Sequence, residues 1–292
     1  PRSALLLVHG LSSAGRRHPQ LVRLARLLAQ HRRLVLVPQF EGLAAFRLSG
    51  REIAEARAAL RALATRSASI GIAGFSFGAG PALVAAADVP DLALTASFGG
   101  YADLHDVIVY LTTGSHEFDG RRYQRPQEEY NRWKLLALLV GFVEDAQDRR
   151  SLDRIAKRRL VDPGDDTRGA EADLGAEGRA ILALVKNRDE HAIGPLLAAL
   201  PSRAHATMKQ LSPLAVVPRL PGRLLIAHGV GDASIPFTES LRLAGASRGR
   251  ATAVIFETFD HVGPQGFWPS LLGKSLDGVR LVQLIDALLT AP

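Results

Sequence analysis

The chain alternates short runs of apolar residues with longer segments whose apolar positions recur every three or four residues. The short runs are continuous and do not alternate with polar residues, which predicts strands buried on both faces of a sheet. These runs lie at 4–8, 34–38, 69–73, 92–98, 223–228 and 252–258. The longer segments predict helices at 16–30, 50–66, 79–87, 236–246 and 277–290. Strands that alternate with helices predict an α/β fold with a mainly parallel sheet of about six strands flanked by helices.

The alternation stops in the middle of the chain. Helical patterns occur there at 125–141, 143–160 and 177–200, without a convincing strand. We therefore expect a core formed by residues 1–100 and 215–292, with residues 101–214 inserted between two core strands as a helical cap or lid.

The formal net charge of +7 is concentrated near the start of the sequence. Residues 1–70 hold 12 arginines against three glutamates, whereas residues 101–220 hold 18 basic and 18 acidic side chains. Part of the excess lies at 16–33, where the leucines share one helix face. These are Leu21, Leu24, Leu27 and Leu28. A basic amphipathic helix can contact a membrane surface, but the same pattern is typical of a surface helix packed on a sheet. No aromatic residues interleave with the arginines, so we expect no nucleic-acid partner.

The chain contains no cysteine, which excludes disulfides, thiolate catalysis and cysteine-ligated metals. The histidines lack metal-ligand spacing, and we expect no metal and no cofactor. No apolar run approaches the roughly 18 residues of a spanning helix. The first apolar run is too short for a signal peptide and ends in His9-Gly10, which favours the cytoplasm. A targeting segment upstream of Pro1 would lie outside the printed sequence, and the oligomeric state is not predicted.

A sharp strand-to-helix turn is predicted at Gly74-Phe75-Ser76-Phe77-Gly78. Glycines mark many tight turns, and the G-x-S-x-G pattern alone is a weak signal. Its functional interpretation is a nucleophile elbow, in which small neighbours allow a strained turn to present a serine hydroxyl at the top of the sheet.

Two further residues follow late strands, where partners of Ser76 would have to lie. Asp232 comes just after the strand at 223–228, and His261 lies in the loop after the strand at 252–258. The chain order of serine, aspartate and histidine is the order of nucleophile, acid and base in hydrolases with this elbow.

With these residues in this order, the chain resembles the α/β-hydrolase-fold serine hydrolases. Its elbow and acid loop are most similar to the dienelactone-hydrolase and small-esterase branches. The resemblance covers about 1–100 and 215–292 in element order. The first strand corresponds to the third strand of the family, so the two leading strands are missing. The dienelactone hydrolases proper have cysteine at the elbow, where this chain has Ser76.

The resemblance implies a carboxylic ester hydrolase that works through an acyl-enzyme without a cofactor. Ser76 would be the nucleophile, His261 the general base, and Asp232 the residue that orients the imidazole. The resemblance places the oxyanion-binding backbone N–H groups at Leu11 and Phe77.

Alternatives remain open at the level of the sequence. Asp103, after an earlier strand, and Asp260, next to the histidine, are rival positions for the acid. The same triad serves amidases, thioesterases and acyltransferases. A non-catalytic binding protein on the same fold, or a protein that docks on membranes through residues 16–33, are further alternatives.

The segment after the fourth predicted strand leads toward the crevice at the carboxyl edge of the sheet. Tyr101, His105 and Tyr110 are therefore expected to contact substrate, although the same segment also fits a hinge helix that packs on the core. The apolar stretch at 133–143 is expected to roof the site. We expect a small-molecule ester with an apolar acyl or aromatic group.

Overall fold

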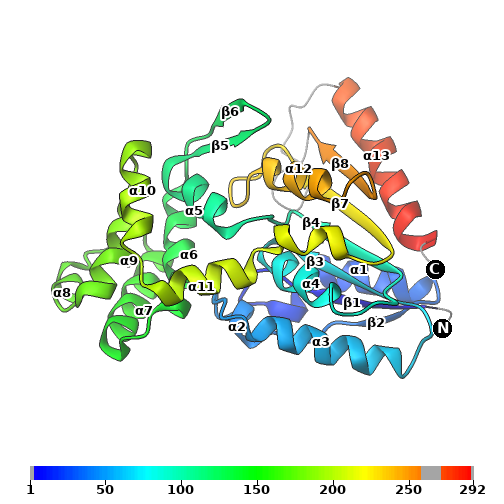
Figure 1. Cartoon of the computed structure of the whole chain (residues 1–292), viewed down its shortest axis with the longest axis horizontal. Coiled ribbons are helices and arrows are strands. Elements are labelled where there is room, and N and C mark those ends of the chain that lie inside the picture. Colours follow the sequence, from blue (N-terminus) through cyan, green and yellow to red (C-terminus); the bar gives the residue numbers. More distant parts are fainter. Residues whose placement is uncertain (1–2, 258–270, 291–292) are drawn as a thin grey trace.

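A six-stranded parallel sheet forms the centre of the molecule (Figure 1). The structure is a computed structural model and describes residues 3–257 and 271–290, with side chains for 277–289 in the second range. The strand order is β2-β1-β3-β4-β7-β8. The strands are β1 (Ala4–Val8), β2 (Leu34–Leu36), β3 (Ile70–Phe75), β4 (Leu94–Phe98), β7 (Arg223–Gly229) and β8 (Ala251–Phe256). Every neighbouring pair is parallel, which confirms the predicted fold class.

Helices cover both faces of the sheet because strand side chains alternate between its two sides. Leu5 and Leu7 of β1 pack in one cluster with residues of α1 (Pro19–Gln30) and α13 (Leu271–Thr290). Leu6 and Val8 point to the other side, toward the larger cluster. That cluster includes residues of α3 (Arg51–Ala64), α4 (Ala79–Ala86) and α12 (Phe237–Ala246). Full burial of one such leucine is worth about 1.5–3 kcal/mol.

The leucines predicted along 16–33 divide between the sheet and the surface. Leu21 and Leu28 are buried against the sheet, as expected for a packed surface helix, whereas Leu27 is 40% exposed. No helix in the described ranges combines the length and the apolar character needed to cross a membrane.

The chain leaves the sheet after β4 and returns at β7, as the sequence predicted. We call residues 99–222 the β4–β7 connection. It contains seven helices among the described residues: α5 (Leu104–Thr113), α6 (Glu129–Leu139), α7 (Ala146–Val161), α8 (Arg168–Ala172), α9 (Ala176–Lys186), α10 (Glu190–Ala198) and α11 (Ser202–Leu211). The predicted helix over 177–200 is two helices, because Asp189 caps a new helix by accepting a hydrogen bond from the N–H of His191.

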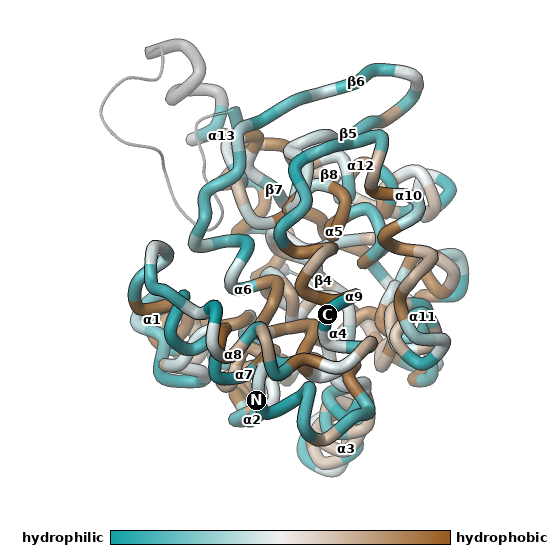
Figure 2. Tube along the Cα trace, turned by 90° about the vertical axis from the view of Figure 1, so that its left-hand side faces the viewer, coloured by the Kyte–Doolittle hydropathy of each residue, from teal (hydrophilic) through white to brown (hydrophobic). Residues whose placement is uncertain are grey.

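The expectation that this part of the chain holds no strand is wrong. β5 (Ser115–Phe118) and β6 (Arg121–Gln124) form an antiparallel hairpin within it. The loop is the pair Asp119-Gly120, both with positive φ (52° and 71°), which is the geometry that Asp-Gly favours in two-residue hairpins. The flanking strands are short and polar, and Figure 2 shows β6 largely hydrophilic. They therefore lack the apolar run that revealed the other strands, and the insertion is not purely helical.

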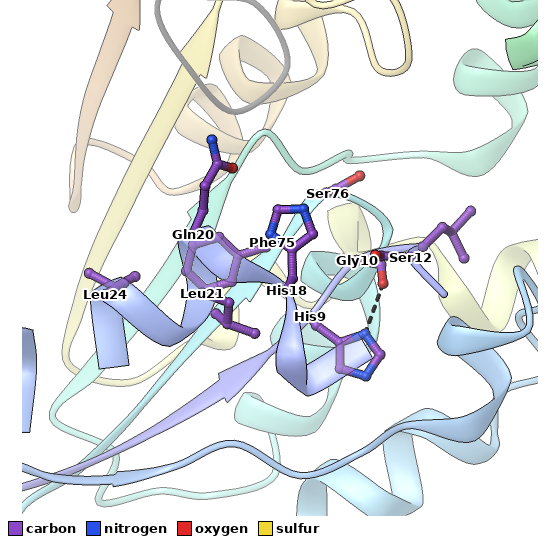
Figure 3. A pocket seen from close by; sticks show the side chains of 10 residues that line it. His9, Gly10, Ser12, His18, Gln20, Leu21, Leu24, Phe75 and Ser76 are labelled. Atoms are coloured by element: carbon purple, nitrogen blue, oxygen red, sulfur yellow. Dashed lines mark hydrogen bonds between the residues drawn. The ribbon is translucent and has the colours of Figure 1, made fainter. Parts of the chain in front are cut away.

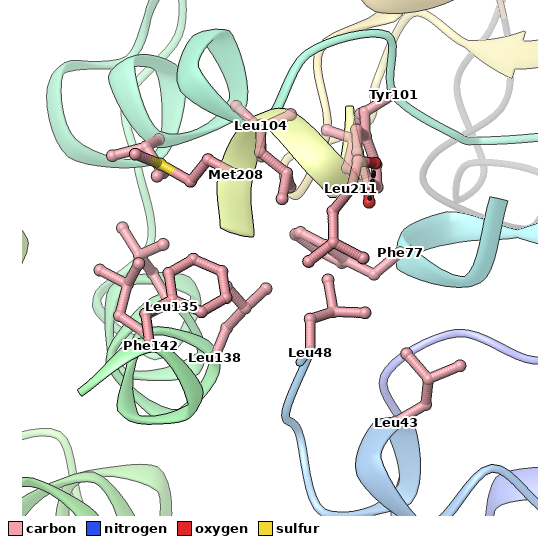
Figure 4. Close-up of a cluster of buried hydrophobic side chains, with 14 of the residues drawn as sticks. Leu43, Leu48, Phe77, Tyr101, Leu104, Leu135, Leu138, Phe142, Met208 and Leu211 are labelled. Carbon is pink, nitrogen blue, oxygen red and sulfur yellow. Dashed lines mark hydrogen bonds between the residues drawn. The ribbon is translucent and has the colours of Figure 1, made fainter. Parts of the chain in front are cut away.

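The β4–β7 connection shares its core with the sheet. Leu135 and Leu138 of α6 belong to the same buried cluster as Phe77 of the predicted elbow and Leu43 of the short helix α2 (Glu41–Ala44) (Figure 4). The division of the chain into a core and a separate cap stays a prediction, because these side chains form one continuous hydrophobic cluster.

Candidate active site

Ser76 stands at a strained turn between β3 and α4. It directly follows β3 and begins the 3₁₀ turn Ser76–Gly78 that leads into the helix. Its φ is 51°, in the left-handed region that costs about 1–2 kcal/mol for a residue with a Cβ. Such backbone conformations gather at functional sites, where the surrounding structure enforces them. The strained residue is thus the serine for which the sequence predicts an elbow.

The two glycines of the G-x-S-x-G pattern allow close backbone approaches. A Cβ on Gly74 would lie 2.8 Å from the Cβ of Ala82, so a side chain there would push α4 off β3. A Cβ on Gly78 would overlap the backbone carbonyl of His9 in the loop after β1. Glycine at these two positions is therefore required to bring strand, helix and loop together around Ser76.

The loop after β1 is fixed against the elbow by Gly10 and His9. A Cβ on Gly10 would lie 2.8 Å from the Cβ of Ser76. The ring of His9 is buried, with Nδ1 2.8 Å from the carbonyl of Gly10 and Nε2 3.1 Å from the N–H of Phe40 (Figure 3). These partners require Nδ1–H to donate and Nε2 to accept, and burial lowers the pKa of His9. His9 is thus a neutral structural residue of this loop.

The predicted oxyanion donors come from the two segments that these contacts hold together. Leu11 follows Gly10, and Phe77 follows Ser76. Within the described part of the chain, the N–H of Leu11 donates to no acceptor. Leu11 and Phe77 also border a narrow gap, too small to hold a water molecule, that reaches α6 and the loop after β7. The two backbone segments therefore lie side by side next to the serine.

Lys134 of α6 lies at the same narrow gap as Leu11 and Phe77. Its ammonium is 3.3 Å from Oδ1 of Asn131 and 3.4 Å from Oγ of Ser234 in the loop after β7. Burial lowers the pKa of Lys134. The contact joins the β4–β7 connection to the loop that carries the predicted acid.

Asp232 is held in that loop by donors to both carboxylate oxygens. Oδ1 accepts the N–H groups of Ser234 (2.7 Å) and Ile235 (2.9 Å). Oδ2 lies 3.1 Å from Nε2 of His228, and the side chains of both residues are fully buried. The hydroxyl of Tyr110 donates to the backbone carbonyl of Asp232 at 2.7 Å. This carboxylate is therefore fixed in position and presented at the carboxyl edge of the sheet.

His228 orients the carboxylate, a role that the sequence did not reveal. Its Nε2 also lies 3.0 Å from the carbonyl of Ile235, and its Nδ1 lies 2.7 Å from Oγ of Ser240. Because Nε2 faces only acceptors, it carries the proton, and Nδ1 accepts from the serine hydroxyl. The available signal was the His-Gly pair at the end of β7, which repeats the pair after β1.

His261 and its neighbour Asp260 lie outside the described residues, so the structure does not place the predicted base. The last described strand, β8, ends beside the loop that carries Asp232. Phe256 pairs with Gly229 in the register of β7 and β8, and its carbonyl accepts the N–H of Val230 at 2.8 Å.

Asp103, the rival acid, caps helix α5. Its Oδ1 accepts the N–H of His105 at 2.9 Å and the hydroxyl of Ser212 at 3.0 Å. The described partners of the Asp103 carboxylate are therefore structural groups of α5 and of the turn after α11.

The three residues expected to contact substrate occupy other environments. Tyr101 is fully buried, and its hydroxyl donates to the carbonyl of Leu211 at 3.1 Å. Tyr110 is buried against the acid loop, as described above. His105 is largely exposed and lines a separate cavity with Asp103. None of the three is among the described residues that line the cavity at Ser76, so the structure gives no support to that expectation.

That cavity has a volume of about 340 Å³ and lies between the elbow, the loop after β1 and the start of α1 (Figure 3). Its size is within the range of small-molecule sites. Its described lining is His9, Gly10, Leu11, Ser12, His18, Gln20, Leu21, Leu24, Phe75 and Ser76. The contribution of α1 to this cavity was not predicted, although the row of leucines at 16–33 was a signal for it.

No protein-family model and no curated protein matches this sequence. Solved structures with a similar fold include a 2,6-dihydroxy-pseudo-oxynicotine hydrolase, at 17% identity and a TM-score of 0.52. The match covers 100% of this chain and 62% of the hydrolase, so the chain spans less than two thirds of that protein. A puromycin-hydrolyzing peptidase from Mycobacterium tuberculosis matches at 17% identity and a TM-score of 0.51, over 99% of this chain and 34% of the peptidase.

A third similar structure belongs to the metagenome-derived lipolytic enzymes LipS and LipT. It matches at 15% identity and a TM-score of 0.50, over 97% of this chain and 93% of that one. Together with the strand order described above, these likenesses show that the chain has the α/β-hydrolase fold.

Proposed function

We propose that the protein is a serine hydrolase that cleaves carboxylic esters through an acyl-enzyme, with Ser76, His261 and Asp232 as its triad. The observation that carries the proposal is the left-handed backbone of Ser76 between two sterically required glycines, at the wall of a cavity of about 340 Å³. Strained backbone gathers at functional sites. Among the described residues other than glycine, Arg32, Phe46, Asp119 and Arg248 also have positive φ, but of this set Ser76 is the one that lines the cavity.

In the proposed reaction, His261 removes the proton of Ser76 as Oγ bonds to the ester carbonyl carbon. The proton then passes from the imidazole to the leaving alcohol as the C–O bond breaks. Water next attacks the acyl-enzyme, with the same base, and releases the acid and the free serine. Asp232 keeps the imidazole in one tautomer and stabilises the imidazolium that forms. The donors that fix the Asp232 carboxylate support this role.

The N–H groups of Leu11 and Phe77 are proposed to bind the oxyanion. The glycine contacts that bring their segments together, and the unused N–H of Leu11 among the described residues, support this assignment. Removal of one oxyanion donor typically costs about 10²–10³ in kcat. The start of α4, just after Ser76, adds the positive end of a helix dipole.

The names of the similar structures, a hydrolase, a peptidase and lipolytic enzymes, agree with hydrolysis as the reaction class. We favour an ester with an apolar group because the cavity wall toward α1 is apolar, at Leu21, Leu24 and Phe75. That wall suits the hydrocarbon part of an ester.

The test is labelling by a fluorophosphonate probe together with hydrolysis of 4-nitrophenyl acetate. Wild type and Ser12→Ala, a matched serine in the same cavity, should be labelled and active. Ser76→Ala should lose both signals while its thermal unfolding stays cooperative. Labelling that survives in Ser76→Ala would identify another nucleophile. A folded wild type that neither reacts with the probe nor hydrolyses esters would be a binding protein on a hydrolase fold.

A further inference from the structure

A second cavity of about 250 Å³ lies between α1 and α13 over the carboxyl ends of the strands. Its described wall is almost entirely hydrocarbon. Phe75, Phe98 and Phe256 come from the ends of β3, β4 and β8, and leucines from both helices complete it. His228 is the exception, and both of its ring nitrogens already have partners. This cavity therefore offers burial to a ligand and no free hydrogen-bonding side chain among the residues described.

The two cavities meet at Leu24 and Phe75, which line both. Phe75 directly precedes Ser76 in the chain. Figure 3 shows Leu24 on the side of the first cavity away from Ser12. The direction from Ser76 past these two side chains thus leads from the first cavity to the second, which lies directly next to it.

The polarity of the lining changes along this direction. Near Ser76, the first cavity offers polar groups from Ser12, His18 and Gln20. Beyond Leu24, the lining is apolar. No charged side chain is among the described residues that line either cavity, so nothing on the wall pairs with a carboxylate or phosphate. The arrangement suits a molecule with a polar reacting centre and an uncharged hydrocarbon chain.

The volume sets the length of that chain. An apolar cavity of about 150 Å³ can hold benzene, so a cavity of about 250 Å³ accepts more than six carbons. Each methylene group buried there is worth roughly 0.8 kcal/mol.

We propose that the substrate is an ester with a medium-length unbranched apolar chain, that this chain occupies the second cavity, and that Leu24 determines the accepted length. The inference rests on the proposed esterase function and adds its substrate class and a specificity residue. The group that binds in the second cavity is a hydrocarbon chain, and either the acyl half or the alcohol half of the ester can supply it.

The test compares Leu24→Trp, which fills the junction, with wild type on 4-nitrophenyl acetate and 4-nitrophenyl octanoate. Because Leu24 also lines the first cavity, the rate on acetate serves as the internal reference, and the readout is the ratio of kcat/KM for the two esters. The octanoate-to-acetate ratio should fall roughly 15- to 200-fold, if two to four methylenes lose their contacts. Ala29→Trp is the matched control, because residue 29 is exposed on the same helix and lines neither cavity. Its ratio should equal that of wild type.

A second arm uses octyl acetate and decides which half of the ester enters the cavity. If Leu24→Trp impairs octyl acetate but not the octanoate ester, the alcohol chain is the occupant. If the variant acts on both long esters as wild type does, with acetate hydrolysis intact, the chain-binding inference fails and the proposed function stands. If wild type hydrolyses no ester at all, the proposed function fails first. Leu24→Ala enlarges the opening between the cavities and should keep or extend the preference for long chains. It tests the inference independently if the tryptophan variant does not fold.

Discussion

At the residue scale, the carboxylate of Asp232, the proposed acid, is fully buried and has hydrogen-bonding partners at both oxygens. The carboxylate of Asp232 accepts two backbone N–H groups and faces the Nε2–H of His228, which Ser240 in turn fixes. An amide at this position would place an NH₂ group against donors. Buried polar groups without partners are costly, so this position distinguishes sharply between aspartate and asparagine.

We therefore expect Asp232→Asn to lower kcat on 4-nitrophenyl acetate by about 10³- to 10⁴-fold, the size seen when a triad aspartate loses its charge. The matched control is Asp103→Asn. Asparagine is as good a helix cap as aspartate, so this variant should keep its stability and stay within a few-fold of wild-type kcat. Steady-state rates and thermal unfolding of both variants measure the contrast. The reverse order of activities would assign the acid to Asp103.

At the element scale, α6 illustrates which part of the site could be predicted from sequence. Its apolar stretch was expected to roof the substrate, because apolar residues near a site suggest a binding wall. The structure instead buries Leu138 and Leu139 in the main hydrophobic cluster, and of the leucines in the described stretch 133–143, Leu135 alone borders the gap beside Leu11. Pattern alone cannot tell a side chain that packs on protein from one that packs on ligand.

Leu138→Ala should consequently lower the free energy of unfolding by about 2–5 kcal/mol, the usual cost of a cavity in a core. It should leave the octanoate-to-acetate ratio unchanged, in contrast to Leu24→Trp. Denaturant unfolding and the two ester rates provide the measurements. A Leu138→Ala protein with unchanged stability and an altered octanoate-to-acetate ratio would indicate that the hydrocarbon chain of the substrate binds against α6.

The β5–β6 hairpin packs on α12 through its aromatic side chains. His116 stacks on Tyr123, lies edge-on to Phe237, and its Nδ1 is 3.0 Å from Oγ1 of Thr238. Burial is the main reason that the pKa of His116 is lowered to about 4. The turn depends on Gly120 at φ 71°. The hairpin is thus a small packed unit whose geometry a single turn residue supports.

Gly120→Ala should lower the free energy of unfolding by about 1–2 kcal/mol, because a Cβ opposes the left-handed backbone, although space around it is free. Gly169→Ala is the control, since that glycine has open space and no positive φ. Denaturant midpoints of the two variants should separate. Equal midpoints would mean that the turn relaxes without cost.

At the scale of the whole molecule, the sheet could be predicted because its strands are mainly apolar runs. The central strands β1, β3, β4 and β7 are almost entirely buried, as that pattern predicts, whereas the edge strands β2 and β8 are partly exposed. The order of Ser76 and Asp232 along the chain also placed both at one edge of that sheet. The cavity could not be predicted, because it depends on how far α1 stands from α13 and from the elbow. The hairpin was missed because its strands are short and polar and lack an apolar run. The role of His228 was missed because a His-Gly pair at a strand end does not show which groups surround the ring.

One buried carboxyl group links the sheet to the β4–β7 connection. Oε2 of Glu239, on α12, accepts the N–H groups of Ala102 (2.9 Å) and Asp103 (2.8 Å), where the connection begins. Nε of Arg242 lies 3.2 Å from the other oxygen without hydrogen-bond geometry, and Asp106 is nearby. Burial raises the pKa of Glu239 to about 8, against the opposing effect of the two N–H donors.

This pKa predicts how stability depends on pH. In the unfolded chain the carboxyl group of Glu239 titrates near its ordinary pKa of 4.5, so between about pH 4.5 and 8 the folded state binds the proton more tightly. The contribution of Glu239 to stability is therefore complete below this window and is lost as the pH rises toward 8.

Glu239→Gln keeps a neutral side chain that can still accept both N–H groups. Its free energy of unfolding, relative to wild type, should rise from pH 5 to pH 8, as urea titrations at several pH values would measure. Glu257→Gln, at an exposed position, should show no such trend. Parallel pH profiles for Glu239→Gln and wild type would mean that the carboxyl group of Glu239 is already ionised at pH 5, with its charge balanced by the nearby Arg242.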